Sequence, residues 1–219
     1  MLRSKFPIEK VVVVLRRFTR RLEAPSVTQV SRSRDPFLVL VATVLSLRTK
    51  DETTERAAAR LFRAARTPRG LLRLRRSEIE KRIYPVSFYR TKAGRLREIA
   101  RALIRDHGGG VPDDMDSLLA LEGVGRKTAN LVLSLAHGKP AICVDVHVHR
   151  ITNRWGYVST RGPEETEFRL REILPRPLWR TLNDLLVMFG KALCRPVSPW
   201  CSRCPIARYC RRVNVGRCR

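Results

Sequence analysis

The chain has 219 residues, 43% of them hydrophobic, which excludes a disordered chain and is sufficient for a packed core. Its 45 Lys and Arg residues against 20 Asp and Glu give a formal charge of +25 and a pI near 11.3. Such self-repulsion favours a polyanionic partner, and nucleic acid is the first candidate. An arginine-rich surface that reflects base composition or a hot habitat would give the same charge.

The N-terminal segment has no pattern of a targeting signal. Its apolar run of five residues is flanked by charge, and no small-residue cleavage site follows. No apolar stretch approaches the roughly 20 residues that a membrane-spanning helix needs. The sequence therefore predicts a soluble, cytoplasmic protein. In that reducing compartment, clustered cysteines favour metal binding over disulfides.

Apolar residues recur at helical spacing, and strand signals are almost absent, so the sequence predicts an all-α fold. The first apolar stripe comprises Ile8, Val11, Val12, Leu15 and Phe18. The stretch DPFLVLVATVLS predicts a helix with Asp35 as N-cap and Pro36 at the first helical position. A capping box from Ser77 to Glu80 predicts the start of another helix.

A further apolar face ends at three consecutive glycines, 108–110, and comprises Leu96, Ile99, Ala100, Leu103 and Ile104. Later helices are predicted over about 126–137, 164–174 and 178–190. The chain contains no internal repeat, low-complexity run or long linker. Any division into domains must therefore come from how the helices pack.

The stretch LLALEGVGRKTANLVLSLAHG predicts two helices joined by a tight hairpin. An apolar helix ends at Leu121, Gly123 and Gly125 flank Val124, and a second helix begins at once. Backbone N–H groups at the start of that second helix would point outward at the positive end of its dipole, which suits a phosphate. An ordinary glycine-containing connection is the alternative.

Two charged residues near this hairpin suit catalysis. Lys127 lies in the first turn of the second helix, where the helix dipole disfavours a positive charge and favours the neutral, nucleophilic amine. A solvated lysine or a phosphate contact is the alternative. Asp145, in AICVDVHVHR, suits either a helix N-cap or a carboxylate that stabilises a cation forming on a substrate.

Four of the six cysteines lie within CRPVSPWCSRCPIARYC in the pattern Cys-x6-Cys-x2-Cys-x5-Cys, at Cys194, Cys201, Cys204 and Cys210. Four thiolates suit zinc or an iron–sulfur cluster, and the spacing by itself does not choose between them.

Three motifs follow one another along the chain: LEGVGRKTAN, VDVHVHR and this cysteine pattern. In this order they resemble the endonuclease III branch of the helix-hairpin-helix DNA glycosylases, and the resemblance covers nearly the whole chain. The resemblance implies that Lys127 is the nucleophile and Asp145 the essential aspartate. It also implies that the four cysteines hold a [4Fe-4S] cluster and that their loop displays Arg195, Arg203 and Arg208 toward DNA. Simple solvation of these arginines is the alternative. The implied DNA contacts are Arg48, Gly123, Val124, Gly125, Thr128 and His147.

The family architecture implies a six-helix barrel over about 29–138 and an iron–sulfur domain formed by 1–28 with 139–219. Double-stranded DNA carrying a damaged base or an abasic site would lie in the groove between them. The resemblance implies a monomer associated with the nucleoid.

The implied activity is that of a bifunctional DNA glycosylase and AP lyase of base excision repair, acting on damaged, chiefly oxidised, pyrimidines. The enzyme would extrude the damaged nucleotide, form a Schiff base through Lys127 and cleave the strand by β-elimination. Relatives that only remove bases generally carry another residue at this position. Lys127 therefore argues against an adenine-specific mispair glycosylase.

Some residues depart from the family pattern. Arg48 stands where the family has a glutamine that fills the gap left by the flipped nucleotide, so preference for the opposite base is open. Glu122 replaces a proline before the hairpin glycine, and a carboxylate so near a phosphate site is unfavourable. His147 matches a family histidine and His149 does not; a core or DNA-contacting role is favoured over a metal site.

Two other functions stay open. One is a mismatch- or uracil-directed glycosylase of the same superfamily. It stays open because the residues that select the damaged base lie in loops that a single sequence does not align with the family. The other is a non-catalytic, metal-stabilised DNA-binding module, which the joint presence of Lys127 and Asp145 disfavours. Cys143, predicted to be buried, and Cys218, near the end of the chain, lie outside the cysteine pattern.

Overall fold

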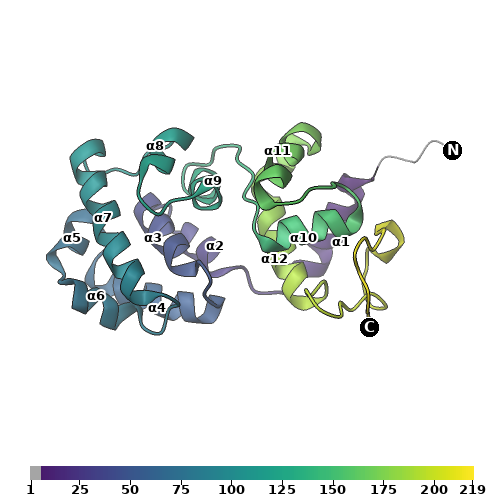
Figure 1. Cartoon of the computed structure of the whole chain (residues 1–219), viewed down its shortest axis with the longest axis horizontal. Helices are drawn as coiled ribbons and strands as arrows, with labels where there is room; N and C mark the ends of the chain where they lie inside the picture. Colours follow the sequence, from purple (N-terminus) through teal and green to yellow (C-terminus); the bar gives the residue numbers. More distant parts are fainter. Residues whose placement is uncertain (1–5) are drawn as a thin grey trace. The chain divides into compact units, whose positions relative to one another are not determined.

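The computed structural model describes residues 6–219, and every regular element in that range is a helix (Figure 1). The predicted all-α class is confirmed. The chain divides into two compact units. The middle unit spans Pro25–Ala141, and the terminal unit combines the segment up to Ala24 with Ile142–Arg219. The boundaries expected from the sequence, at 29 and 138, fall just inside the middle unit. No helix within 6–219 is long and apolar enough to cross a membrane.

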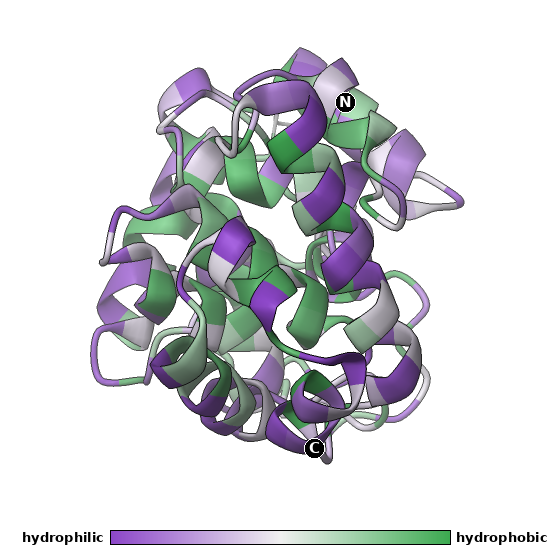
Figure 2. Cartoon of the chain, turned by 90° about the vertical axis from the view of Figure 1, so that its left-hand side faces the viewer, coloured by the Kyte–Doolittle hydropathy of each residue, from purple (hydrophilic) through white to green (hydrophobic). Residues whose placement is uncertain are grey.

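The middle unit is built around helix α3, Pro36–Ser46, which packs against α2, α4, α7 and α9. Every residue of α3 from Phe37 to Leu45 is buried, because all of them except Thr43 are apolar, and the Thr43 hydroxyl donates to the carbonyl of Val39 at 2.7 Å. Figure 2 shows that other helices carry both hydrophobic and hydrophilic residues. The remaining helices of this unit are α2 Ser26–Ser31, α4 Asp51–Ala64, α5 Pro68–Arg73, α6 Arg76–Ile83, α7 Tyr89–His107, α8 Met115–Ala120 and α9 Arg126–Leu135.

Two of the predicted helix boundaries are confirmed in the middle unit. The Asp35 carboxylate caps α3, since its Oδ1 accepts hydrogen bonds from the backbone N–H groups of Phe37 (2.9 Å) and Leu38 (3.2 Å). Helix α7 ends at His107, and its C-cap is Gly108, whose φ of 61° lies in the left-handed region that glycine adopts without strain.

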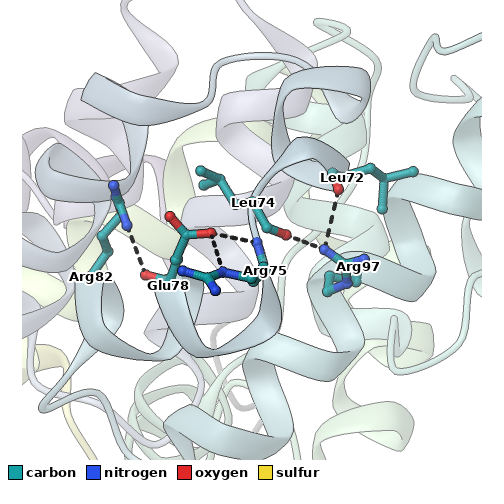
Figure 3. Close-up of polar contacts among 6 residues, drawn as sticks. All are labelled: Leu72, Leu74, Arg75, Glu78, Arg82 and Arg97. Atoms are coloured by element: carbon teal, nitrogen blue, oxygen red, sulfur yellow. Dashed lines mark hydrogen bonds and ion pairs between the residues drawn. The ribbon is translucent and has the colours of Figure 1, made fainter.

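The capping box predicted at Ser77 is wrong. Helix α6 begins at Arg76, with Arg75 as N-cap, and the carboxylate of Glu78 accepts a 2.8 Å hydrogen bond from the Arg75 backbone N–H (Figure 3). The glutamate at the third helical position is therefore Glu78 and not Glu80. At the start of α6, the Ser/Thr-x-x-Glu signal fits only Ser77 and Glu80, and an arginine N-cap has no side-chain acceptor, so that signal could not mark Arg75.

The junction between α5 and α6 is held by an arginine from a neighbouring helix (Figure 3). Arg97 of α7 donates to the backbone carbonyls of Leu72 (3.3 Å) and Leu74 at the end of α5. The bonds from Arg97 satisfy carbonyl groups that the end of α5 leaves without an intrahelical partner. Arg82 donates to the carbonyl of Glu78 (3.1 Å) within its own helix, α6.

The terminal unit joins the N-terminal helix to the last third of the chain. Helix α12, Trp179–Ala192, packs against both α1, Ile8–Thr19, and α10, Val146–Trp155. Its core includes the fully buried side chains of Leu15, Trp155 and Phe189. The unit also holds α11, Pro163–Ile173, and two short 3-10 helices, η1 Arg176–Leu178 and η2 Ala207–Tyr209.

Candidate functional site

The predicted hairpin lies between α8 and α9. Gly123 has a φ of 84°, a left-handed conformation that favours glycine, and the backbone N–H of Val124 donates to the carbonyl of Leu121 at 3.0 Å. The Val124 side chain is buried and anchors the turn. Gly125 is the N-cap of α9, and no side chain caps the helix there. The structure therefore contains the tight helix–turn–helix connection that the glycines predict.

Gly125 differs from Gly123 in what surrounds it. A side chain added at Gly125 would meet no heavy atom within 4 Å, and its φ of −96° suits any residue. Neither backbone conformation nor packing within the chain requires glycine here. The absence of a side chain therefore leaves open space in front of the first turn of α9, which suits close approach of an external group.

Glu122, the unfavourable residue beside the hairpin, has a partner. Its carboxylate forms an ion pair with the guanidinium of Arg95 on α7. The Arg95 side chain also lies against the hairpin, because a Cβ at Gly123 would come within 2.8 Å of its Cδ. Arg95 thus compensates the negative charge of Glu122 beside the predicted phosphate site.

The two predicted catalytic residues belong to different units. Lys127 is half-buried in the first turn of α9 in the middle unit, and Thr128 beside it is buried. Asp145 is the N-cap of α10 in the terminal unit, and its Oδ1 accepts 2.9 Å hydrogen bonds from the backbone N–H groups of His147 and Val148. These bonds fix the orientation of a carboxylate that is only 8% exposed.

The two histidines after Asp145 are held by different contacts. The His147 ring packs against Gly190 of α12, where any added Cβ would collide with Nδ1, and Nδ1 lies 3.1 Å from Nη2 of Arg150. The Nδ1 of His149 instead forms a 2.7 Å hydrogen bond with the hydroxyl of Thr166 on α11. His149 therefore belongs to the packing of α10 on α11.

Arg48 lies in the turn between α3 and α4. Its side chain is exposed, its φ is 55°, and its guanidinium lies 5.8 Å from the ring centroid of Phe88. A left-handed backbone is unfavourable for a long side chain, so neighbouring groups must hold this turn in place.

The four patterned cysteines line one pocket of the terminal unit, together with the apolar side chains of Trp155, Phe189, Leu193, Trp200 and Ile206. The pocket excludes Cys143, which is buried before α10, and Cys218, which is exposed. Among residues 6–219, no group of three or more His, Cys, Asp or Glu side chains is arranged to hold a single metal ion.

The chemistry of this pocket suits thiolates bound to a cationic group. Burial raises the pKa of the Cys204 thiol to about 11 and also raises the pKa of Cys210, so both thiols are protonated unless a metal compensates their charge. N–H groups point at the sulfurs: Arg154 Nη1 lies 3.5 Å from Cys194 Sγ, and the backbone N–H of Arg212 donates to Cys210 Sγ at 3.4 Å. The donors and the apolar lining fit an iron–sulfur cluster.

The cysteine loop also carries the three exposed arginines expected to face DNA. The guanidinium of Arg208 lies 4.6 Å from the ring centroid of Tyr209, and that of Arg203 lies 5.7 Å from that of Trp200. Arg195 Nε donates to the carbonyl of Lys191 at 3.3 Å. All three are exposed, which both contact with DNA and simple solvation require, so their contact with DNA stays a prediction.

Sequence reasoning missed two buried cations. Arg154 of α10 donates to the carbonyls of Arg195 and Pro196, both at 2.6 Å, and so holds the start of the cysteine loop. Lys92 of α7 is 7% exposed. Its signal was present, because Lys92 precedes Leu96 by four residues and so continues the apolar stripe of its helix.

Residues 41–176 match the HhH-GPD superfamily of base excision DNA repair proteins. The chain is 47% identical over 191 residues to endonuclease III of Thermotoga maritima, a match that covers 86% of this chain and 90% of that protein. It is also similar to a solved structure of endonuclease III trapped as a covalent intermediate with DNA, with a TM-score of 0.84, 32% identity, and coverage of 96% of this chain and 97% of that one.

A thermostable thymine-DNA glycosylase has a similar structure as well, with a TM-score of 0.82, 26% identity, and coverage of 93% of this chain and 94% of that one. The fold, the hairpin and the family match define a helix-hairpin-helix protein of base excision repair. Identity to endonuclease III over most of both chains narrows this class, and the chain belongs to the endonuclease III family. It is accordingly an enzyme, a DNA glycosylase and AP lyase.

Proposed function

We propose that this enzyme acts as a monomer on damaged, chiefly oxidised, pyrimidines in double-stranded DNA, and that it removes the base and cleaves the strand through Lys127. The excess of 25 positive charges supports binding to a polyanion. The similarity to endonuclease III trapped covalently with DNA supports a covalent route. A cytoplasmic location at the nucleoid stays a prediction.

In the proposed reaction, the neutral Lys127 amine attacks C1′ of the extruded nucleotide. The C1′–N bond breaks, and the base leaves with the bonding electrons and takes up a proton. Loss of the amine proton and opening of the sugar ring give a Schiff base. This acidifies C2′–H, so that removal of that proton expels the 3′ phosphate by β-elimination.

Asp145 would stabilise the positive charge that develops on the sugar during this attack. Both of its described hydrogen bonds go to Oδ1, which fixes the position of Oδ2. A carboxylate that is already oriented needs little reorganisation during the reaction.

The hairpin would bind a DNA phosphate near the lesion through backbone N–H groups at the start of α9, with Gly123, Val124 and Gly125 shaping the turn. Open space around the α-carbon of Gly125 supports this role. Arg48 would contact the base left without a partner, since a guanidinium both stacks and donates hydrogen bonds. Thr128 and His147 complete the proposed DNA-binding residues. Thr128 is buried and His147 is half-buried, so both would lie beside these contacts.

A [4Fe-4S] cluster is the proposed cofactor, held by Cys194, Cys201, Cys204 and Cys210. When bound, it would cross-link a loop that has little regular structure. Arg154 and the backbone of Arg212 would then donate to the ligating sulfurs and hold their orientation.

One observation carries the proposal: Lys127 lies in the first turn of α9, directly after the uncapped hairpin, in a chain 47% identical to an endonuclease III. Borohydride trapping tests it on duplexes that hold an abasic site or an oxidised pyrimidine. Wild type and Lys81→Ala, which changes an exposed lysine of the same unit, are expected to form a covalent adduct on both duplexes. Lys127→Ala is expected to form none. Adduct formation by Lys127→Ala would refute this assignment.

A thymine- or uracil-directed activity on mispairs with guanine is the second candidate. The similarity to a thymine-DNA glycosylase favours it, and Arg48 in place of the family glutamine leaves the opposite base open. Single-turnover base removal from T·G and U·G duplexes, compared with an oxidised pyrimidine opposite adenine, separates the two candidates. Faster removal from the mispairs would replace the first.

A further inference from the structure

Lys92 lies under the turn that carries Arg48. Its amine donates to the carbonyls of Leu45 (2.8 Å) and Leu47 (2.6 Å) and to the hydroxyl of Thr49 (3.1 Å). An ammonium has three N–H donors, and all three are used. The three acceptors lie on both sides of Arg48, so one buried amine binds the chain before and after this residue.

The Thr49 hydroxyl extends this network. It accepts from Lys92 and from the backbone N–H of Ser87 (3.3 Å), and it donates to the carbonyl of Leu47 at 3.2 Å. The turn is therefore tied to the segment that precedes α7. Every bond in the network lies within the middle unit.

The start of α7 holds Arg48 by two routes. Phe88, the residue before the helix, lies against the Arg48 guanidinium, and Lys92, one turn into the helix, holds the backbone on both sides of Arg48. The Lys92 backbone N–H also donates to the carbonyl of Phe88 at 2.9 Å. One helix start thus holds the backbone, and contacts the side chain, of a residue whose own conformation is unfavourable.

The charge state of Lys92 is consistent with this arrangement. Burial lowers its pKa to about 8, while hydrogen bonds to three oxygens favour the ammonium form. The amine is therefore mostly protonated at neutral pH. Burial of a cation with neutral partners costs free energy. A neutral side chain or a water molecule would also satisfy the carbonyl groups at the end of α3, so helix termination alone does not explain the ammonium.

We infer that Lys92 is a positioning residue for damage recognition: it holds the Leu47–Thr49 turn in the conformation that presents Arg48 to DNA. The inference rests on the proposed contact between Arg48 and the orphaned base. Lys92 acts through the turn and does not itself touch DNA. Without this amine, the chain would still carry Arg48, but the turn would no longer hold its backbone in the left-handed conformation.

Equilibrium binding tests the inference without requiring catalysis. The probes are a duplex with a tetrahydrofuran abasic analogue and the same duplex without damage, at one fixed salt concentration. Lys92→Met and Arg48→Ala are each expected to lower the preference for the damaged duplex by about tenfold. Binding of Lys92→Met to the undamaged duplex should change by less than about twofold. Lys81→Met is the control for loss of one lysine charge.

The double variant separates positioning from general stability. If Lys92 acts through Arg48, Lys92→Met in the Arg48→Ala background should reduce the preference by less than a further twofold or so. Additive losses, or equal losses of affinity for both duplexes, would overturn the inference. Thr49→Val removes one acceptor and leaves Lys92 in place; it should give a smaller loss in the same direction. It serves as the test if Lys92→Met does not fold.

Failure of the proposed function gives a different result. If wild type does not prefer the damaged duplex, or Arg48→Ala keeps the full preference, the role of Arg48 is wrong and the inference falls with it. If Arg48→Ala loses the preference while Lys92→Met and Thr49→Val keep it, only the role of Lys92 is wrong.

Discussion

The core of the middle unit and the cysteine loop of the terminal unit are held in opposite ways. Helix α3 buries nine consecutive residues among four neighbouring helices. Residues 194–219 contain only one 3-10 helix of three residues, and side chains such as Arg154 hold their backbone. The first region depends on its own apolar side chains, whereas the second depends on polar contacts and on the proposed cluster.

The largest expected effect is on the cysteine loop. Cys204→Ala removes a proposed ligand from the pocket, so the visible iron–sulfur absorbance should be lost. Limited proteolysis should then cut within 194–219 while the middle unit stays protected. Cys143→Ala, which alters a buried cysteine outside the pocket, should keep the absorbance. Retained absorbance and protection in Cys204→Ala would show that the loop does not need this ligand.

A substitution in α3 should lower the stability of the protein but leave the iron–sulfur absorbance unchanged. Leu40 is fully buried, and Leu40→Ala should lower the free energy of unfolding by about 2–5 kcal/mol because it leaves a cavity. Denaturant titration followed by circular dichroism measures this loss, and the iron–sulfur absorbance of the folded protein should not change. Val13→Ala, at a position 65% exposed on α1, should alter stability by less than about 0.5 kcal/mol. Similar losses in both variants would contradict the dominance of the α3 core.

Arg154 links the core of the terminal unit to the cysteine loop. Arg154→Met removes the charged donor that two partly buried carbonyl groups share, a loss of about 1.5–3 kcal/mol. The absorbance of the proposed cluster should then decay faster in the presence of an iron chelator. Arg203→Met, at an exposed position of the same loop, is the matched control. Equal decay rates in the two variants would assign the stability of the loop to the cluster rather than to Arg154.

The smallest expected effect is on the cap of α3. Asp35→Ala removes the acceptor for two backbone N–H groups and should lower stability by about 1 kcal/mol. Asp35→Asn keeps an oxygen that caps the helix and should retain most of this stability. Thermal unfolding of the three proteins measures the difference. A loss as large as that of Leu40→Ala would mean that the cap, and not burial, fixes α3.

Local sequence signals predicted much of the fold. Asp35 and Asp145 act as N-caps, and Gly108 ends α7, because each signal needs only a few neighbouring residues. The start of α6 was placed wrongly because its N-cap, Arg75, lacks the capping side chain that the short pattern at Ser77 supplies. The hairpin was predicted from its glycines, and the positive φ of Gly123 confirms the tight turn.

Candidate site residues were predicted less completely. The pattern of four cysteines identified residues that line one pocket, but it did not reveal Arg154, which lies 40 residues before the first of them. Glu122 looked unfavourable because its partner, Arg95, belongs to another helix. Charge compensation between distant helices has no local sequence signal.

The all-helical class, the basic charge, the glycine hairpin and the cysteine spacing can all be read from the amino-acid sequence, which also carries the family resemblance. The side chains that support these features are set by the packing of the helices. Lys92 meets Leu45 across 47 positions, and His147 packs on Gly190 of another helix. Helix signals depend on neighbours within a few residues, whereas these contacts depend on how separate helices pack, which spacing along the chain does not specify.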